Sequence, residues 1–492
     1  MCAVLKSAVI LNAMFIVCVL CNKPIAETTK GQVAGFKKDV DGQDVYLSMG
    51  IPYAKPPTAM RRFKPPESPD TWKATGVLNA THAKPSCPQK KEMVKMALGS
   101  GFAIEEISED CLYLNVYTPT KKQPMKSDSL AVIFFLHGGG FQMGSGTLWD
   151  YSILARYANV VVVSINYRLG VLGFLATEDS AASGNWGLLD QRMALQWTQD
   201  NIENFGGDKT RVTLLGHAAG AYSVGLHIMS PMSRGLFKRA ISQAGTIKSP
   251  ALLNTNTLRR VKPLAMMVKC LPRGTAFDSK KVVACLRKVP FSELLKHDAH
   301  TSGKFTATVD GHFLPADPIE LLRQGNYVPV DYIMGGNSDE GSSVAAKIPN
   351  FYKGDGLNKT DFEKYISNAV PYALTKPIPD AAKSALRAVI SAKYFPREVT
   401  PSAFRKAYLS ALGEVILSMM MKNAHYYSNK GTVFLYKFTH RPSNARFPKY
   451  VGAGHTEELQ FIFGYILKNG TNDEKRLSAD WMKTWGDFAR TG

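Results

Sequence analysis

The chain has 492 residues, of which 45% are apolar, and this proportion is enough to build a large buried core. Lys and Arg exceed Asp and Glu by a formal net charge of +20. The basic residues are scattered in short groups, without interleaved aromatic residues and without a zinc-finger or helix-turn-helix signature, so specific nucleic-acid recognition is not expected. The charge predicts a solvated basic surface or, as an alternative, a surface that docks acidic glycans.

The chain begins with a stretch typical of a secretory signal peptide, residues 1–21. Lys6 precedes an apolar run over residues 8–20, which is too short to span a bilayer comfortably. An uncleaved membrane anchor is the alternative. No second long apolar segment follows, and no repeat or low-complexity linker interrupts the chain. We therefore expect residues 27–492 to form one large, secreted, soluble domain with inserted loops and no transmembrane span.

Four cysteines remain beyond this leader, and their spacing predicts two local disulfides, Cys87–Cys111 and Cys270–Cys285. An even number of cysteines in an exported chain favours disulfides over metal ligation, so no metal is expected. No cofactor is expected either. Three sequons predict a glycosylated surface, at Asn79, Asn358 and Asn469.

Short apolar runs alternate with helical periodicity along the chain. Between two of these runs, Leu189, Met193 and Trp197 recur at helical spacing and predict a helix that ends near residues 205–207. Continuous apolar strands separated by helices are typical of a mainly parallel sheet covered on both faces, which is an α/β fold. The runs that predict buried strands are residues 131–136, 161–165, 212–215, 239–243 and 433–437.

Two glycine-rich motifs follow strands of this predicted sheet. Gly216–Gly220 has the frame of a G-x-S-x-G nucleophile elbow, but alanine occupies its centre as Ala218. A methyl group cannot attack a carbonyl carbon. The run His137–Phe141 exposes backbone N–H groups without side-chain obstruction, and such groups bind the oxyanion in ester hydrolysis. The expected oxyanion donors are Gly139, Gly140 and Ala219.

Several blocks make the chain similar to the type-B carboxylesterase/cholinesterase family, from about residue 30 to the end. The blocks are Gly50–Ala54, Glu109–Pro119, Asn166–Phe174, Gly184–Asp190 and Phe205–Asp208, which leads into the elbow. The resemblance implies the α/β-hydrolase fold, with Glu340 as the acid and His455 as the general base of a triad whose nucleophile position is Ala218. Family members continue for several tens of residues beyond the position of Gly492, so the resemblance implies either an apparent C-terminal truncation or a protein that lacks the last elements.

Other departures from the family's sequence pattern restrict the class of ligand. Cholinesterases hold a quaternary ammonium group with a tryptophan between the first two disulfide cysteines, and this chain has none there. Phe102 lies in that segment, but its spacing does not place it. Choline esters are therefore not expected as ligands. The block Ser242–Thr246 carries Ala244 where the family usually has serine.

A replacement nucleophile is not expected. Ser145 follows the glycine run, Thr213 lies in a strand, and Ser223 lies a turn into the helix after the elbow, so none occupies the apex. His217, beside the apex, is interpreted as a residue that lines the pocket.

Three functions remain open. The first is a secreted, esterase-like protein that does not hydrolyse and instead binds a small ester, an acid or a lipid-like molecule. Such a protein could alternatively bind a cell-surface protein as an adhesion module, as serine-less relatives such as neuroligin, neurotactin and glutactin do. The second is an active carboxylic ester hydrolase whose serine was mutated or misrecorded; retention of Glu340 and His455 favours it. The third is a polyanion-binding surface protein.

Overall fold

The computed structural model describes residues 23–99, 101–120, 128–247, 252–298, 304–346, 348, 351–352, 357–373 and 379–492. The expected signal peptide, residues 1–21, lies outside these ranges. Within them, no helix is long and apolar enough to cross a membrane.

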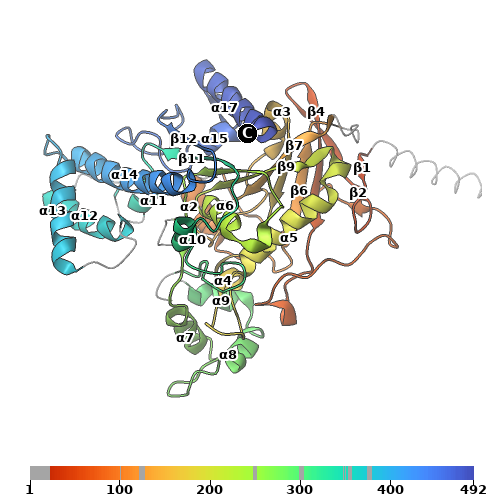
Figure 1. Cartoon of the computed structure of the whole chain (residues 1–492), viewed down its shortest axis with the longest axis horizontal. Coiled ribbons are helices and arrows are strands. Elements are labelled where there is room, and N and C mark those ends of the chain that lie inside the picture. The colour runs from red at the N-terminus through yellow and green to blue at the C-terminus, as the bar shows by residue number, and fades with distance from the viewer. Residues whose placement is uncertain are drawn as a thin grey trace, which may run out of the picture.

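A nine-stranded sheet forms the centre of the molecule (Figure 1). Its order is β12-β11-β10-β9-β7-β8-β6-β4-β3. The strands from β12 to β8 in this order run parallel, whereas β6, β4 and β3 are antiparallel to their neighbours. Their bounds are β3 Phe36–Val40, β4 Gln43–Pro52, β6 Tyr113–Thr118, β7 Leu130–Leu136, β8 Val161–Ile165, β9 Gly207–His217, β10 Arg239–Gln243, β11 Asp331–Asn337 and β12 Val433–Phe438. This mixed but mostly parallel sheet is the α/β-hydrolase architecture that the sequence predicts.

Helices cover both faces of the sheet. Successive strand residues point to opposite sides, so a continuously apolar strand has an apolar side chain to bury on each face. In β7, Val132 and Phe134 join a core with helices α5 and α6, while Ile133 and Phe135 join a second core with α3, α15 and α17. The helix predicted around Leu189 is confirmed as α5. These helices span α3 Tyr151–Ala158, α5 Trp186–Asn201, α6 Ala219–Met229, α15 Leu459–Ile462 and α17 Asn472–Thr491.

Three further helices form a separate small core away from the sheet, at the end of the molecule coloured cyan to blue in Figure 1. The longest of them, α14, runs from this core back to the sheet and packs on β11 and β12. Their bounds are α12 Lys359–Ala373, α13 Asp380–Tyr394 and α14 Pro401–Tyr427.

The remaining elements are short. A small sheet near the N-terminus pairs β1 Ile25–Ala26, β2 Val33–Ala34 and β5 Leu78–Asn79. The connections contain α2 Lys91–Leu98, α4 Gly170–Phe174, α7 Leu258–Met267, α8 Ser279–Leu286, α9 Phe291–Asp298, α10 Pro318–Gln324, α11 Ser342–Ala345 and α16 Ile466–Asn469. Among the described residues, three short 3-10 segments connect these elements: Ala59–Arg61, Ile202–Phe205 and Pro231–Ser233.

The prediction that residues 433–437 form a buried strand is wrong in its burial. The strand exists as β12, but Phe434 is 47% exposed and Leu435 is 54% exposed. The reason is position, because β12 lies at the edge of the sheet and pairs only with β11.

Both disulfides are present, with Cα–Cα distances of 5.0 Å for Cys87–Cys111 and 5.5 Å for Cys270–Cys285. The second bridge joins the end of α7 to α8. The three sequon asparagines are exposed, and their glycosylation stays a prediction.

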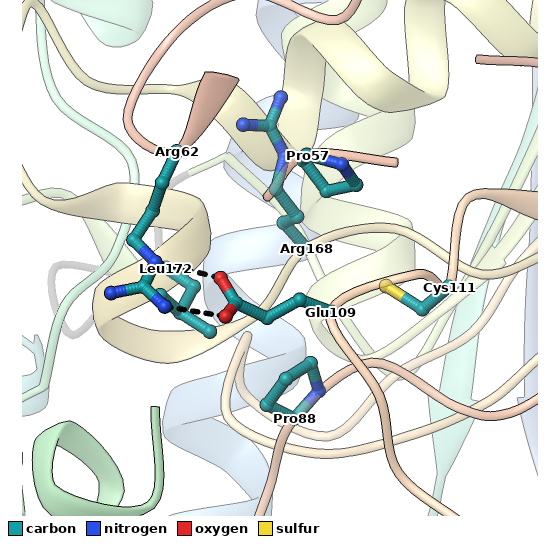
Figure 2. A pocket seen from close by; sticks show the side chains of 7 residues that line it. All are labelled: Pro57, Arg62, Pro88, Glu109, Cys111, Arg168 and Leu172. Carbon is teal, nitrogen blue, oxygen red and sulfur yellow. Dashed lines mark hydrogen bonds and ion pairs between the residues drawn. The ribbon is translucent and has the colours of Figure 1, made fainter. Parts of the chain in front are cut away.

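A small recess beside Cys111 is shown in Figure 2. Both carboxylate oxygens of Glu109 accept hydrogen bonds from the guanidinium of Arg62, at 2.7 and 2.5 Å. Arg62 also donates to the carbonyl of Leu286, at 3.0 Å. Arg62 and Glu109 are therefore paired with each other, and Arg168, the third charged residue of the recess, is paired with Asp190. We assign the recess a structural role.

Candidate active site

The elbow lies between β9 and α6. Ala218 has φ 51° and ψ −113°, a backbone conformation that costs a non-glycine residue energy and that marks functional turns. Its N–H donates to the carbonyl of Gln243 at 2.9 Å, and its carbonyl accepts from the N–H of Tyr222 at 3.0 Å. A Cβ atom on Gly220 would lie 1.9 Å from the carbonyl oxygen of Leu136, so only glycine fits there. The backbone thus presents the side chain of residue 218 as an elbow would present a nucleophile.

The glycine run lies directly beside the elbow. A Cβ atom on Gly138 would be 3.2 Å from the methyl carbon of Ala218. Gly139 and Gly140 adopt φ values of 107° and 64°, which favour glycine. Within the described residues, the N–H groups of Gly139, Gly140 and Ala219 donate to no backbone acceptor. The three expected oxyanion donors therefore occupy neighbouring segments and are available to a ligand.

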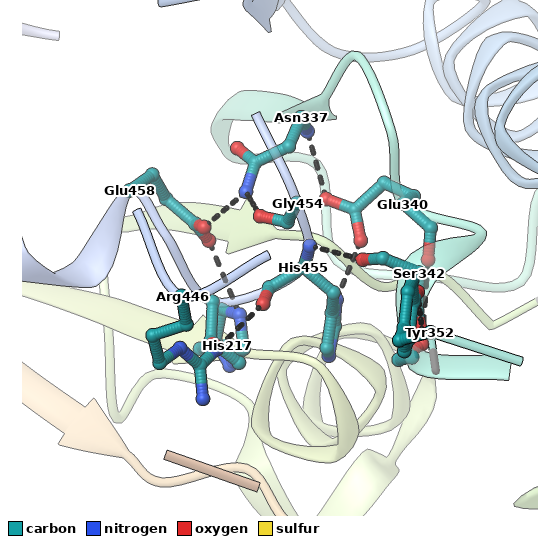
Figure 3. A network of polar contacts seen from close by, with 11 residues as sticks. His217, Asn337, Glu340, Ser342, Tyr352, Arg446, Gly454, His455 and Glu458 are labelled. Carbon is teal, nitrogen blue, oxygen red and sulfur yellow. Dashed lines mark hydrogen bonds and ion pairs between the residues drawn. The ribbon is translucent and has the colours of Figure 1, made fainter. Parts of the chain in front are cut away.

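His455 and Glu340 meet although 115 residues separate them in the sequence. The Nδ1 atom of His455 lies 2.5 Å from Oε2 of Glu340 (Figure 3). The other carboxylate oxygen of Glu340 accepts the N–H of Asn337 at 2.7 Å. The backbone N–H of His455 donates to the hydroxyl of Ser342 at 2.8 Å. A buried carboxylate thus orients an imidazole, which is the arrangement that a general base requires.

A second imidazole–carboxylate pair lies beside the first, and the sequence analysis missed it. Nε2 of His217 is 3.1 Å from Oε1 of Glu458. The side-chain amide of Asn337 donates to the other oxygen of Glu458 at 2.5 Å. The rings of His217 and His455 are 4.9 Å apart between centroids. Asn337 therefore holds both carboxylates, one through its backbone and one through its side chain. Glu458 stands three residues after His455, and this short spacing is the only sequence signal for it.

These carboxylates determine the protonation of the site. Burial lowers the pKa of His455, but Glu340 and Glu458 together outweigh burial, so its pKa lies above the ordinary value of 6.5. Burial raises the pKa of Glu458, but the contacts with His217, His455 and Asn337 lower it by more. The pKa of Glu458 therefore lies below its ordinary value. Glu458 therefore stays ionised and favours a proton on His455.

Replacing Glu458 with glutamine is expected to lower the pKa of His455, because one of its two stabilising carboxylates is lost. A group with a raised folded pKa contributes stability below its unfolded pKa, near 6.5, and loses that contribution as pH rises through the folded pKa. Glu458→Gln should therefore narrow the pH range over which His455 stabilises the protein. Long-range ¹H–¹⁵N NMR of the imidazoles measures this pKa, with the exposed Asp473→Asn as control. An unchanged pKa of His455 would contradict this account.

The other hydroxyls considered as nucleophiles lie away from the apex. Ser223 is buried, donates to the carbonyl of Ala219 at 3.1 Å and accepts from Gln191. Ser145 donates to Asn166 at 3.1 Å, and Thr213 is fully buried within β9.

Phe102 packs against Trp149 and Tyr465, with centroid distances of 4.6 and 5.4 Å.

The family model described as "Carboxylesterase family" matches residues 22–492. The chain belongs to the carboxylesterase family. Among its relatives, human neuroligin-2 is 35% identical across 95% of this chain. Mouse carboxylesterase 1F is 34% identical across 98%, and rat liver carboxylesterase 1F is 36% identical across 95%. The chain spans 60% of the length of neuroligin-2, and 90% and 86% of the two carboxylesterases. This carboxylesterase-family chain therefore resembles both neuroligins and carboxylesterases to a similar degree.

Proposed function

We propose that this carboxylesterase-family protein binds a ligand at its esterase-type site without hydrolysing it. The observation that carries the proposal is Ala218, a methyl group at an elbow whose backbone geometry is otherwise that of a nucleophile turn. Loss of the serine from a hydrolase costs roughly 10⁶ in turnover. His455 and Glu340 then have no hydroxyl proton to accept.

The ligand class follows from the groups that stay available. N–H donors at Gly139, Gly140 and Ala219 suit a carbonyl or carboxylate oxygen, and His455 adds a further polar group. A small ester, an acid or a lipid-like molecule with such a head group fits these donors. The two disulfides support a secreted, extracellular location, because disulfides persist in oxidising compartments.

The natural protein is expected to show no serine-type turnover of p-nitrophenyl acetate or butyrate. Purified protein should release p-nitrophenol without an initial burst, and treatment with an organophosphate should leave the residual rate unchanged. Steady-state and stopped-flow absorbance measure both properties. A burst, or a rate that an organophosphate abolishes, would overturn the proposal and favour an active hydrolase that uses another nucleophile.

A cell-surface protein is the second candidate ligand, favoured by the 35% identity to neuroligin-2. Such a partner would bind the outer surface rather than the site. Binding to cells that survives His455→Ala would support this candidate, whereas binding lost with His455→Ala would assign the interaction to the site.

A further inference from the structure

The segment that the Cys87–Cys111 bridge closes, here called the disulfide loop, contacts both halves of the candidate site. On one side, Gln89 donates to the carbonyl of Gly144 and accepts its N–H, both at 2.8 Å. Gly144 follows the oxyanion glycines closely in the chain. On the other side, the C-terminal end of α2 reaches the segment that carries His455. The disulfide loop therefore bridges the segment that follows Gly139 and Gly140 and the segment that carries His455.

The contact on the His455 side is made by Arg446. Its Nη1 group donates to the carbonyl of Ala97 at the end of α2. Its Nη2 group donates to the hydroxyl of Thr456 at 2.6 Å. The same group donates to the carbonyl of His455 at 3.4 Å (Figure 3). The guanidinium of Arg446 thus joins the end of α2 to two consecutive residues, the expected general base His455 and its neighbour Thr456. The planar fork of arginine can do this, whereas the point charge of lysine cannot.

Arg446 is itself fixed in this position. Its Nε atom lies 3.4 Å from the buried carboxylate of Glu457, and its guanidinium lies over the ring of Phe447, 5.2 Å from the centroid. A Cβ atom on Gly99 would lie 3.4 Å from Cδ of Arg446, so the arginine stem packs along the end of α2.

The backbone next to His455 needs such support. Thr456 has φ 77°, a conformation that a β-branched residue adopts rarely and that persists only where surrounding contacts enforce it. The hydroxyl of that same residue accepts the hydrogen bond from Arg446 at 2.6 Å.

We propose that Arg446 is a positioning residue that links α2, in the disulfide loop, to His455 and Thr456. Local opening of α2 and disordering of His455 then occur together. Any effect of this link on ligand binding rests on the function proposed above. By this coupling, release of α2 frees the strained turn at Thr456 and disorders the imidazole of His455.

The test compares Arg446→Gln with the exposed control Arg476→Gln, whose side chain is 75% exposed in a surface ion pair. Both variants are made in the natural Ala218 chain. Limited trypsin digestion, followed by reduction of the disulfides, reports cleavage at Lys91 and Lys95 of α2. Imidazole NMR reports the order and pKa of His455. Arg446→Lys tests whether the fork itself is required.

Arg446→Gln should speed cleavage in α2 by about ten-fold, because proteolysis follows the population of the open form. In the same variant the His455 signals should broaden and its pKa should rise, since Arg446 lowers that pKa. Arg446→Lys should resemble the glutamine variant in cleavage rate and in the broadening of the His455 signals. Its His455 pKa should stay nearer that of the natural protein, because lysine keeps the positive charge. Arg476→Gln should match the natural protein in every readout. Faster cleavage with an unchanged His455 signal would overturn the coupling, and so would no change in either readout. Neither readout requires turnover or a ligand, so such a failure leaves the non-hydrolytic proposal standing.

Discussion

Replacing Ala218 with serine is expected to raise the hydrolysis of p-nitrophenyl esters by at least about 10³-fold, within the loss of roughly 10⁶ that removal of such a nucleophile causes. The reason is that two further features of an esterase site are assembled. The backbone at residue 218 already has the elbow geometry, and the Glu340–His455 pair is assembled at 2.5 Å. The gain should be abolished by an organophosphate, which forms an adduct on the restored hydroxyl.

The pH dependence of this revertant follows from the protonation of His455. As a general base His455 must be neutral, and its pKa lies above the ordinary 6.5 because Glu340 and Glu458 outweigh burial. Activity should therefore fall as pH decreases through that pKa. Adding Glu458→Gln to the revertant should move the profile toward lower pH.

The control for the revertant is the double variant Ala218→Ser/His455→Ala, which should stay near the natural protein. Circular dichroism verifies that each variant is folded. A folded single revertant without esterase activity would show that the pocket has changed beyond the elbow. Activity in the double variant equal to that of the single revertant would remove His455 from the base role.

Replacing Asp190 with alanine is expected to lower the free energy of unfolding by about 3–5 kcal/mol, the cost of leaving a buried charge without its partner. Asp190 is fully buried, and its carboxylate accepts from Nε and Nη2 of Arg168 at 2.7 and 2.6 Å. Arg168, only 3% exposed, also donates to the carbonyl of Lys64 at 2.8 Å. The pair thus ties the segment after β8 to α5.

Urea unfolding measures this loss, with Asp473→Ala as the control. Asp473 belongs to an ion pair whose side chains are 75% and 87% exposed, so its removal should change stability by no more than about 0.5 kcal/mol. A loss below about 1 kcal/mol for Asp190→Ala would contradict the assignment of the buried pair as a principal support of this region.

The sequence predicted the parts of the site whose chemistry depends on backbone shape. Glycines at 216 and 220 predicted the turn between a strand and a helix, and the structure has β9 and α6 there. The glycine run predicted N–H groups beside this turn. Such features are local, because a missing side chain has the same steric meaning in any protein.

The Glu340–His455 pairing came only from the family resemblance, because no local pattern links residues so far apart in the chain. Asn337 and Glu458 were missed for the same reason, since their roles depend on which loops the sheet brings together. The apolar run of β12 was interpreted as buried because apolar sequence does not distinguish a central strand from an edge strand. The antiparallel strands β3, β4 and β6 and the separate core of α12–α14 were likewise set by tertiary packing.

The most direct test of the missing nucleophile is intact-protein mass spectrometry after incubation with a fluorophosphonate. The natural protein should keep its mass, while Ala218→Ser should gain one phosphonyl group that peptide mapping places at position 218. A stoichiometric adduct on any side chain of the natural protein would contradict the account.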